Sequence, residues 1–270
     1  MISTALSLLA KLTAAERDIA GIAVKLSPFD LVTCEGNLNG LNGCEKLESI
    51  TAYNNKLDGA LDLTGCTALK TLDVYVEDVE DDKDTEEVEK TVRGNLTSLK
   101  INGLKNLTSV IAYNNAITAV PSLEGCEKLT SVNLSKNSIT DVSGAAVPVS
   151  KDSEGKETFV VTTLNLSENN ISDISALEKV TSLTTLDLGK NSISDITAIG
   201  KLTTLTTLTL TNNEGITSLD PIVENFPATS TLTLNIIGTK IASDTDAIKT
   251  IQDKFSTMKI TYMLDKEGSK

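Results

Sequence analysis

The sequence predicts an elongated α/β solenoid, in which one short coil is repeated along most of the chain, and three observations support this fold class. The segments LTTLDLGKN (183–191) and LTTLTLTNN (205–213) are near copies whose starts lie 22 residues apart. Between them, apolar residues recur at every third position. Aromatic residues make up only 3% of the chain and tryptophan is absent, so the core must be built from aliphatic side chains. Such a core suits many small identical layers better than one large globule.

The shared pattern is LxxLxLxxN, the leucine-rich repeat, and it gives each coil one short strand. The fourth and sixth residues point inward with the two-residue period of a strand. One coil cannot bury its own apolar side, so the coils must stack and align their strands into one parallel, concave sheet. Clear copies start at residues 47, 107, 129, 161, 183 and 205, and a weaker copy at 69 has Glu77 in place of the asparagine. With degenerate copies at 26–34, 229–237 and 255–263, we expect about ten coils.

An asparagine at the ninth position turns the chain at the end of each strand. Its buried amide can bond to backbone groups of adjacent coils, so we predict a structural ladder through the solenoid. The predicted rungs are Asn55, Asn115, Asn137, Asn169, Asn191 and Asn213. Behind the strand, apolar residues at every third position from Ile171 to Leu183 suit tight turns on the convex side.

Three of the four cysteines occupy the coil position that Val180 and Leu202 hold in other coils; they are Cys44, Cys66 and Cys126. A position shared by Cys, Leu and Val is a core position, where cysteine acts as a small hydrophobe. Cys34 falls at the ninth position of its coil, where Cys is a known alternative to Asn. We predict four buried free thiols, and the alternative is a disulfide between Cys44 and Cys66.

These coils resemble those of the bacterial leucine-rich-repeat class with 22-residue coils, as in internalin-like surface proteins. The segments that carry the resemblance are NNISDISAL (169–177) and NSISDITAI (191–199), each with an Asp-Ile pair. The coils GCEKLTSVNL and GCTALKTLDV are also similar to repeats of gut-bacterial surface proteins. The resemblance covers residues 26–263 and implies a right-handed superhelix. Members of such families commonly bind proteins or glycans, so it also implies recognition on or outside a bacterial cell.

Both ends of a solenoid need caps, because a terminal coil would otherwise expose its apolar face. Residues 1–25 are predicted to form an N-terminal helical cap, with an amphipathic helix over 2–24. Residues 26–240 form the solenoid itself. Residues 241–270 are predicted to form a C-terminal cap, in which a helix starts near Ser243 and a last strand follows in MKITYML (258–264).

Two insertions interrupt the period, at about 77–95 and 143–160. The first includes EDVEDDKDTEEVEK (77–90), whose nine acids and two lysines carry more than half of the net charge of −13. Calcium favours clustered carboxylates, but the spacing of known calcium loops is missing. We therefore interpret this segment as a solvated charge run, with calcium binding as the alternative. The second insertion is predicted to form a β-hairpin with Gly155 in its turn.

The composition argues against catalysis and against several classes of partner. Histidine is absent, which removes the commonest general base and the commonest metal ligand. We expect no enzyme activity, no cofactor and no metal site. The net charge of −13 argues against nucleic acid and anionic membrane surfaces. No apolar run reaches the ~18 residues of a membrane span, so we expect no membrane insertion.

The apolar stretch from Ala5 to Ala10 has no basic segment before it, so we interpret it as folded structure and not as a signal peptide. The expected location is secreted or at the cell surface, with a signal peptide that is not part of this chain. A cytoplasmic location stays open.

The candidate ligand site lies on the N-terminal half of the concave face. The seventh repeat position carries Tyr53, Tyr75 and Tyr113 in three consecutive coils, which are three of only four tyrosines. Rigid rings with a polar tip are enriched at binding hot spots. The flanking candidates are Ile111, Val76, Asn54 and Asn114. In the C-terminal half the face is mostly Thr, Ser and Asn, as expected of an ordinary β-surface.

We therefore expect a non-enzymatic recognition module whose partner is an unidentified protein bound at the concave face. A ladder of tyrosines with asparagine neighbours can also stack sugars, so a glycan is the alternative ligand. A structural spacer within a larger surface protein is the alternative from another class.

Overall fold

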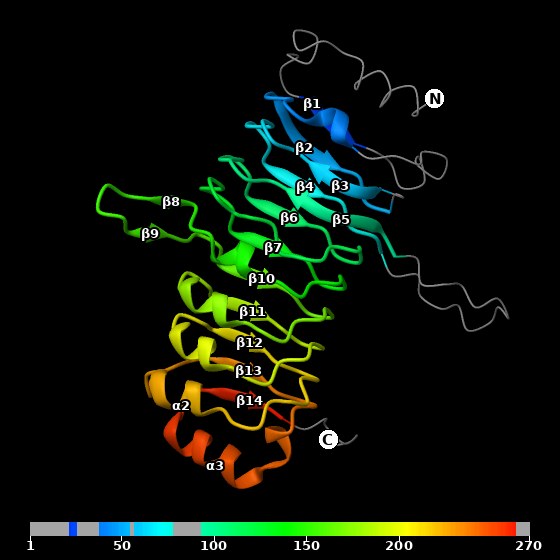
Figure 1. Cartoon of the computed structure of the whole chain (residues 1–270). Coiled ribbons are helices and arrows are strands. Elements are labelled where there is room, and N and C mark those ends of the chain that lie inside the picture. Colours follow the sequence, from blue (N-terminus) through cyan, green and yellow to red (C-terminus); the bar gives the residue numbers. More distant parts are fainter. Residues whose placement is uncertain (1–21, 26–37, 55–56, 78–92, 263–270) are drawn as a thin grey trace, which may run out of the picture.

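The computed structural model describes residues 22–25, 38–54, 57–77 and 93–262. They form a stack of similar coils, each of which adds one strand to the same sheet (Figure 1). The fourth and sixth repeat residues point into the stack, and Leu186 and Leu188, for example, are both 0% exposed. The predicted α/β leucine-rich-repeat solenoid is confirmed.

The main sheet contains ten parallel strands within the described residues, ordered β1-β2-β4-β6-β7-β10-β11-β12-β13-β14. Their bounds are β1 (Ile22–Lys25), β2 (Leu47–Thr51), β4 (Thr71–Asp73), β6 (Ser109–Ile111), β7 (Ser131–Asn133), β10 (Thr163–Asn165), β11 (Thr185–Asp187), β12 (Thr207–Thr209), β13 (Thr233–Asn235) and β14 (Lys259–Thr261). Leu72 pairs with Val110 and Val132 pairs with Leu164. Both insertions therefore leave the strand register of the sheet unchanged.

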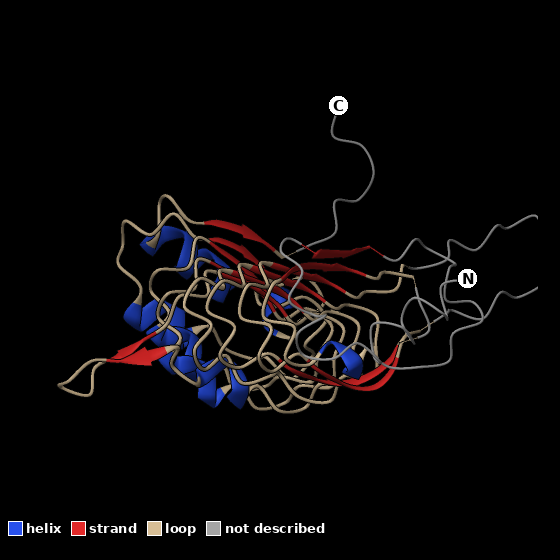
Figure 2. Ribbon diagram, turned by 90° about the horizontal axis from the view of Figure 1, so that it is seen from above, coloured by secondary structure: helices blue, strands red, loops and turns tan. Residues whose placement is uncertain are grey.

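In the described part of the chain, two further pairs of strands lie outside the main sheet. Strands β3 (Asp58–Asp62) and β5 (Asn95–Lys100) form a separate parallel pair, which lies apart from the main sheet in Figure 2. The second insertion forms the antiparallel hairpin β8 (Ser150–Lys151) and β9 (Glu157–Thr158), which projects from the solenoid. Gly155 lies in its turn with φ +80°, as the predicted hairpin requires. Most of the acidic run, residues 78–92, lies outside the described residues.

The convex side is built mainly from short 3₁₀ helices. They are η1 (Asn39–Leu41), η2 (Ser143–Ala146), η3 (Ser175–Lys179), η4 (Thr197–Lys201) and η5 (Ile241–Ser243). A 3₁₀ helix has three residues per turn, so residues three apart share one face. This geometry explains the three-residue apolar rhythm: Ile174, Leu177 and Val180 are all buried along η3.

The C-terminal end is closed by the helix α3 (Thr245–Lys254), followed by β14. The side chain of Asp244 caps the helix by accepting a hydrogen bond from the Ala247 N–H, at 3.0 Å. Ile248 and Ile251 are buried against the last coils. A second helix, α2 (Asp220–Asn225), was not expected from the sequence. Its Pro221 sits in the first turn, where proline is well tolerated.

The predicted frame is wrong at both ends of the solenoid. Residues 22–25 form strand β1 and not the end of a helix, and Val24 pairs with Ile50 of β2. The strand next to β2 is therefore not in the degenerate copy at 26–34, which itself lies outside the described residues, as do Cys34 and residues 1–21 of the predicted cap. Ile22 and Val24 are β-branched and fit a pleated sheet better than a helix.

At the other end, the copies predicted at 229–237 and 255–263 are placed two residues too early. Leu234, and not Leu232, pairs with Leu208, and Ile260 pairs with Leu234. Apolar residues alternate here with a period of two, so a shift of two residues keeps the same face inward and the pattern does not reveal it.

Three of the predicted free thiols are confirmed: Cys44, Cys66 and Cys126 are buried and unpaired by disulfides. The Cys66 thiol donates to the Leu41 carbonyl at 3.0 Å, and the Cys126 thiol donates to the Ile101 carbonyl at 3.1 Å. Burial raises the pKa of both Cys66 and Cys126 to about 11. These thiols stay protonated at neutral pH and act as core residues.

Candidate functional site

Three tyrosine rings form one continuous stack just beyond the ends of β2, β4 and β6. The ring centroids of Tyr53 and Tyr75 lie 5.2 Å apart with an interplanar angle of 7°. Those of Tyr75 and Tyr113 lie 4.6 Å apart with an angle of 16°. Neighbouring parallel strands are about 4.8 Å apart, so the sheet itself sets the spacing of the rings. We call Tyr53, Tyr75 and Tyr113 the tyrosine stack.

Backbone hydrogen bonds continue past the strands and fix the stack in register. The Asn54 N–H donates to the Tyr75 carbonyl at 2.9 Å, and the Val76 N–H donates to the Tyr113 carbonyl at 3.2 Å. All three rings are half-buried; Tyr75 stacks on a ring at each face, and Tyr53 and Tyr113 each stack on Tyr75. The stack is therefore ordered by the fold, and binding would not have to order it.

The carboxylate of Asp73 lies on the same face, two residues before Tyr75. Thr71 and Asp73 face outward on β4, because Leu72 between them is fully buried. The half-buried Asp73 side chain forms no hydrogen bond or ion pair with any residue in the described part of the chain. Burial raises the pKa of this carboxyl group above its usual range. Sequence reasoning missed Asp73, although an acid two residues before a tyrosine marks only this coil of the three.

The pKa of Tyr75 is also raised, first by burial and then by the nearby negative charge of Glu77, with smaller effects of Tyr53 and Asp73. The phenol therefore stays neutral and its oxygen remains a hydrogen-bond acceptor and donor. The middle of the tyrosine stack thus combines apolar ring surface with oxygen atoms and a carboxylate that has no partner among the described residues.

Of the flanking candidates, Ile111 lies half-buried on the concave face and pairs with Asp73 in the sheet. Val76 and Asn114 do not belong to an open surface, since they are only 6% and 8% exposed. Asn114 has a left-handed backbone, with φ +55°. Its amide donates to the Val76 carbonyl at 3.1 Å. The prediction that Val76 and Asn114 are open to a ligand is wrong, because this bond ties the Asn114 side chain to the neighbouring coil and Gly94 packs against Val76.

Asn54 is half-buried at the equivalent position, also with φ +55°. Its amide donates to the Glu77 carboxylate at 2.7 Å and its oxygen accepts from the Glu77 N–H at 2.6 Å. This reciprocal pair joins the first two coils of the stack. Asn54 therefore acts as a clamp between coils, and its side chain is not free for a ligand.

The predicted asparagine ladder has a repeated geometry. The Asn137 oxygen accepts from the Ile117 N–H at 3.0 Å, while its amide donates to the carbonyls of Ala112 and Leu134, both at 3.0 Å. Equivalent contacts are made by Asn169, Asn191 and Asn213. Asn191 is half-buried and the other two are buried. Asn55 lies outside the described residues.

Asn115 is the rung that supports the tyrosine stack. Its amide donates to the carbonyl of Val74 at 3.0 Å and to that of Tyr113 at 3.2 Å, so it ties together the coils of two stacked rings. Gly94 packs directly on this amide, because a Cβ added there would lie 2.0 Å from the Asn115 oxygen and 2.9 Å from a methyl of Val76. The close approach of Gly94 also explains why Val76 is buried.

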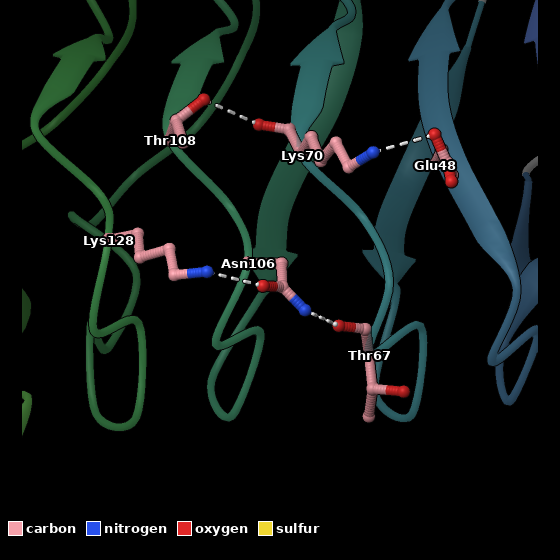
Figure 3. Close-up of polar contacts among 6 residues, drawn as sticks. All are labelled: Glu48, Thr67, Lys70, Asn106, Thr108 and Lys128. Carbon is pink, nitrogen blue, oxygen red and sulfur yellow. Dashed lines mark hydrogen bonds and ion pairs between the residues drawn. The ribbon is translucent and has the colours of Figure 1, made fainter.

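A second polar row runs where the coils of the N-terminal half enter the sheet (Figure 3). Lys70 pairs with Glu48 at 2.8 Å, Lys128 donates to the Asn106 side chain at 2.8 Å, and the Thr108 hydroxyl donates to the Lys70 carbonyl at 2.9 Å. The donors and acceptors of this row bond to one another between successive coils. These bonds connect neighbouring coils. Exposed ion pairs of this kind contribute about 0–1 kcal/mol each to the free energy of unfolding.

The described residues contain no cluster of three or more His, Cys, Asp or Glu side chains placed to hold a metal ion. Within the same residues, no helix has the length and apolar character needed to cross a bilayer.

Comparisons with known proteins support the leucine-rich-repeat pattern found in the sequence. The family model described as Leucine Rich repeats (2 copies) matches residues 105–146, 161–201 and 181–225. The functional domain of InlJ from Listeria monocytogenes, described as including a cysteine ladder, has the same fold, with a TM-score of 0.50 and 20% identity over 72% of this chain. None of the curated proteins matches.

Two further Listeria monocytogenes structures are similar at 25% identity: an internalin, inlF, over 71% of this chain with a TM-score of 0.43, and internalin C2 over 58% with a TM-score of 0.41. The chain covers 56% of the inlF structure, 40% of the InlJ structure and 72% of the internalin C2 structure. The expected resemblance to internalin-like proteins is supported at the level of the fold, by the InlJ domain. The matched repeats and the fold shared with InlJ show that the chain contains leucine-rich repeats and has the leucine-rich-repeat fold.

Proposed function

We propose that this chain is a non-enzymatic recognition module that binds a protein partner through the N-terminal half of its concave face. The observation that carries the proposal is the tyrosine stack, in which three rings 5.2 and 4.6 Å apart form one patch. Clustered tyrosines offer a large, rigid contact area at a small cost in side-chain entropy. The internalin-like fold supports the same conclusion, since solenoids of this kind present extended concave surfaces.

The geometry of the stack favours a protein over a glycan. Sugar rings stack on the open faces of aromatic side chains, but both faces of Tyr75 and one face each of Tyr53 and Tyr113 are taken up within the stack. The edges of the rings are what a partner would meet. A protein surface can fill such an uneven strip with apolar side chains and hydrogen-bond donors.

The test replaces Tyr53, Tyr75 and Tyr113 together by serine, which the same repeat position carries in later coils. The wild-type chain and the triple variant are compared on a display library of random peptides and on a glycan array. We expect peptide binding to wild type, near-complete loss in the triple variant, and little change in its thermal unfolding. Truncation at true hot spots costs about 2 kcal/mol or more per residue.

The matched control replaces Thr185, Thr207 and Thr209 by alanine on the C-terminal half of the face, and we expect it to bind like wild type. Glycan hits without peptide binding would replace this proposal by the glycan-binding alternative. Binding that survives the tyrosine changes but falls in the threonine control would move the site to the other half. A chain that binds neither library would be a structural spacer.

We further propose a secreted or cell-surface location, which the internalin-like fold supports. The complete gene, searched for a signal peptide and an anchor, tests this location.

A further inference from the structure

We propose that the segment bound at the tyrosine stack is basic, with an arginine side chain that lies along the rings and pairs with Asp73. This inference rests on the proposed function and names the chemistry of its partner. The juxtaposition that carries it is an unpartnered, half-buried carboxylate on β4 directly before the middle ring of the stack.

The carboxylate of Asp73 differs in its hydrogen bonding from other polar side chains at the fifth repeat position, which line up across neighbouring strands. At the same repeat position, the Asn165 oxygen accepts hydrogen bonds from the N–H and hydroxyl of Ser167, at 3.0 and 2.8 Å. The Asp187 oxygen accepts from the Gly189 N–H at 2.9 Å. In the coil of Asp73 the seventh residue is Tyr75, and no comparable bond forms. The half-buried charge of Asp73 is thus left for a group outside the described chain.

The surrounding sheet supplies no cation to neutralise it. The outward-facing residues of β2, β4, β6 and β7 are Ser49, Thr51, Thr71, Asp73, Ser109, Ile111, Ser131 and Asn133. None of them is basic. Along the row of Asp73, the next basic residue in the sheet register is Lys25 of β1, which pairs with Thr51 and lies two strands away.

Arginine matches both parts of the site. Its guanidinium group bonds a carboxylate through two parallel N–H groups, and its aliphatic stem packs on apolar surface. The edge-exposed rings of the stack and the half-buried Ile111 provide that surface. An apolar or acidic side chain would leave Asp73 partly buried without a partner, which costs free energy, and a neutral donor would leave its charge uncompensated. Charge complementarity therefore selects a basic occupant.

The experiment selects peptides from a random display library on the full chain. Peptides that also bind the Tyr53, Tyr75 and Tyr113 triple serine variant are removed first. That variant keeps every acidic residue, so the removal discards peptides attracted only by the net charge of −13. We expect arginine to be enriched in the remaining peptides. The best peptide is then synthesised and titrated by calorimetry against wild type, Asp73→Asn and Asp187→Asn.

Asp187→Asn is the matched control, because it removes one charge from the same column at a carboxylate that already has a local partner. We expect Asp73→Asn to weaken binding about tenfold or more, and Asp187→Asn to change it less than about twofold. An arginine-to-citrulline peptide should lose the same factor against wild type and nothing further against Asp73→Asn.

Selected peptides that depend on the tyrosines but are not basic, or that bind Asp73→Asn as well as wild type, would overturn the basic occupant and leave the proposed function standing. Failure to select any peptide that the tyrosine variant does not bind, or glycan hits alone, would overturn both.

Discussion

The two halves of the concave face share the same backbone geometry. They differ in the contacts that their outward-facing side chains make at the fifth and seventh repeat positions. In the C-terminal half, the fifth and seventh residues of a coil bond to each other, as Asn165 does with Ser167. In the N-terminal half, the seventh residues contact each other between coils as the tyrosine stack, and the Asp73 side chain has no partner in the part of the chain that the structure describes. The scaffold thus fixes positions, while the choice of side chain decides whether a column is satisfied internally or available to a partner.

The largest effect should come from the ladder, which both halves share. Asn213 is fully buried, and its loss would strand the Ile193 N–H and the Leu188 and Leu210 carbonyls. We expect Asn213→Ala to lower the free energy of unfolding by about 3 kcal/mol, and Asn191→Ala, which is half-buried, by about 2 kcal/mol. Chemical denaturation measures both. Equal, small losses would mean that the ladder does not hold the coils together.

The second prediction concerns a stability difference between the two halves. Among the described residues, a glycine packs on an amide of the asparagine ladder only in the N-terminal half. A methyl group at Gly94 would overlap the Asn115 amide. We expect Gly94→Ala to cost about 2 kcal/mol of stability, in the range of overpacked cores, and to disturb the tyrosine stack above it. A stable Gly94→Ala variant would show that the segment around residue 94 moves freely.

A third prediction concerns the eighth repeat position, which has positive φ in six coils: Asn54, Asn114, Lys136, Glu168, Lys190 and Asn212. Asparagine tolerates this left-handed conformation better than lysine. We expect Lys136→Asn to raise stability by about 0.5 kcal/mol and Asn54→Ala to lower it by about 1 kcal/mol, since Asn54 also loses its bonds to Glu77. Thermal unfolding of the two variants decides this, and opposite signs would refute the left-handed turn.

The smallest expected effect is on pH dependence. Burial raises the pKa of both Asp73 and Asp187, and for Asp187 the negative charge of Glu168 adds to the increase while the bond from Gly189 opposes it. A carboxyl group whose pKa is raised in the folded state favours folding at low pH and loses that contribution as pH rises through the folded pKa. Asp73→Asn and Asp187→Asn should each stabilise the protein at pH 7, by less than about 0.5 kcal/mol after screening.

This gain should disappear below pH ~3.9, the ordinary value for aspartate. Unfolding curves at neutral and acidic pH test it. A gain that persists at low pH would mean that shape, and not charge, is what the asparagine improves.

The coils between residues 47 and 213 could be predicted because a leucine at the fourth position and an asparagine at the ninth fix both the face and the register. At Leu232, Leu234 and Ile236 only the alternation remains, and a shift by two residues is invisible in it. Leu234 pairs with Leu208, 26 positions earlier, which is four residues more than the 22-residue period. This longer coil contains α2, which lies against η4 and takes the place that the shorter η3 and η4 hold in the two preceding coils.

The same logic explains the site. Tyr53, Tyr75 and Tyr113 could be placed together because equal repeat positions in successive coils must be neighbours. The burial of Val76 and Asn114 could not be predicted, since it depends on the hydrogen bond between these two residues and on the approach of Gly94 from beyond the insertion. Asp73 lacks the hydrogen bond that the seventh residue of the coil gives to the fifth residue in other coils, because its seventh residue is Tyr75. The repeat pattern does not predict which of these bonds form.

The tyrosine stack also gives the protein an optical signature of its own. The chain has no tryptophan and only four tyrosines, so three rings in parallel contact dominate its near-ultraviolet absorption. Chromophores held this close couple their electronic transitions, and the coupling vanishes when the rings separate. Near-ultraviolet circular dichroism therefore reports on this one strip of the concave face without any label.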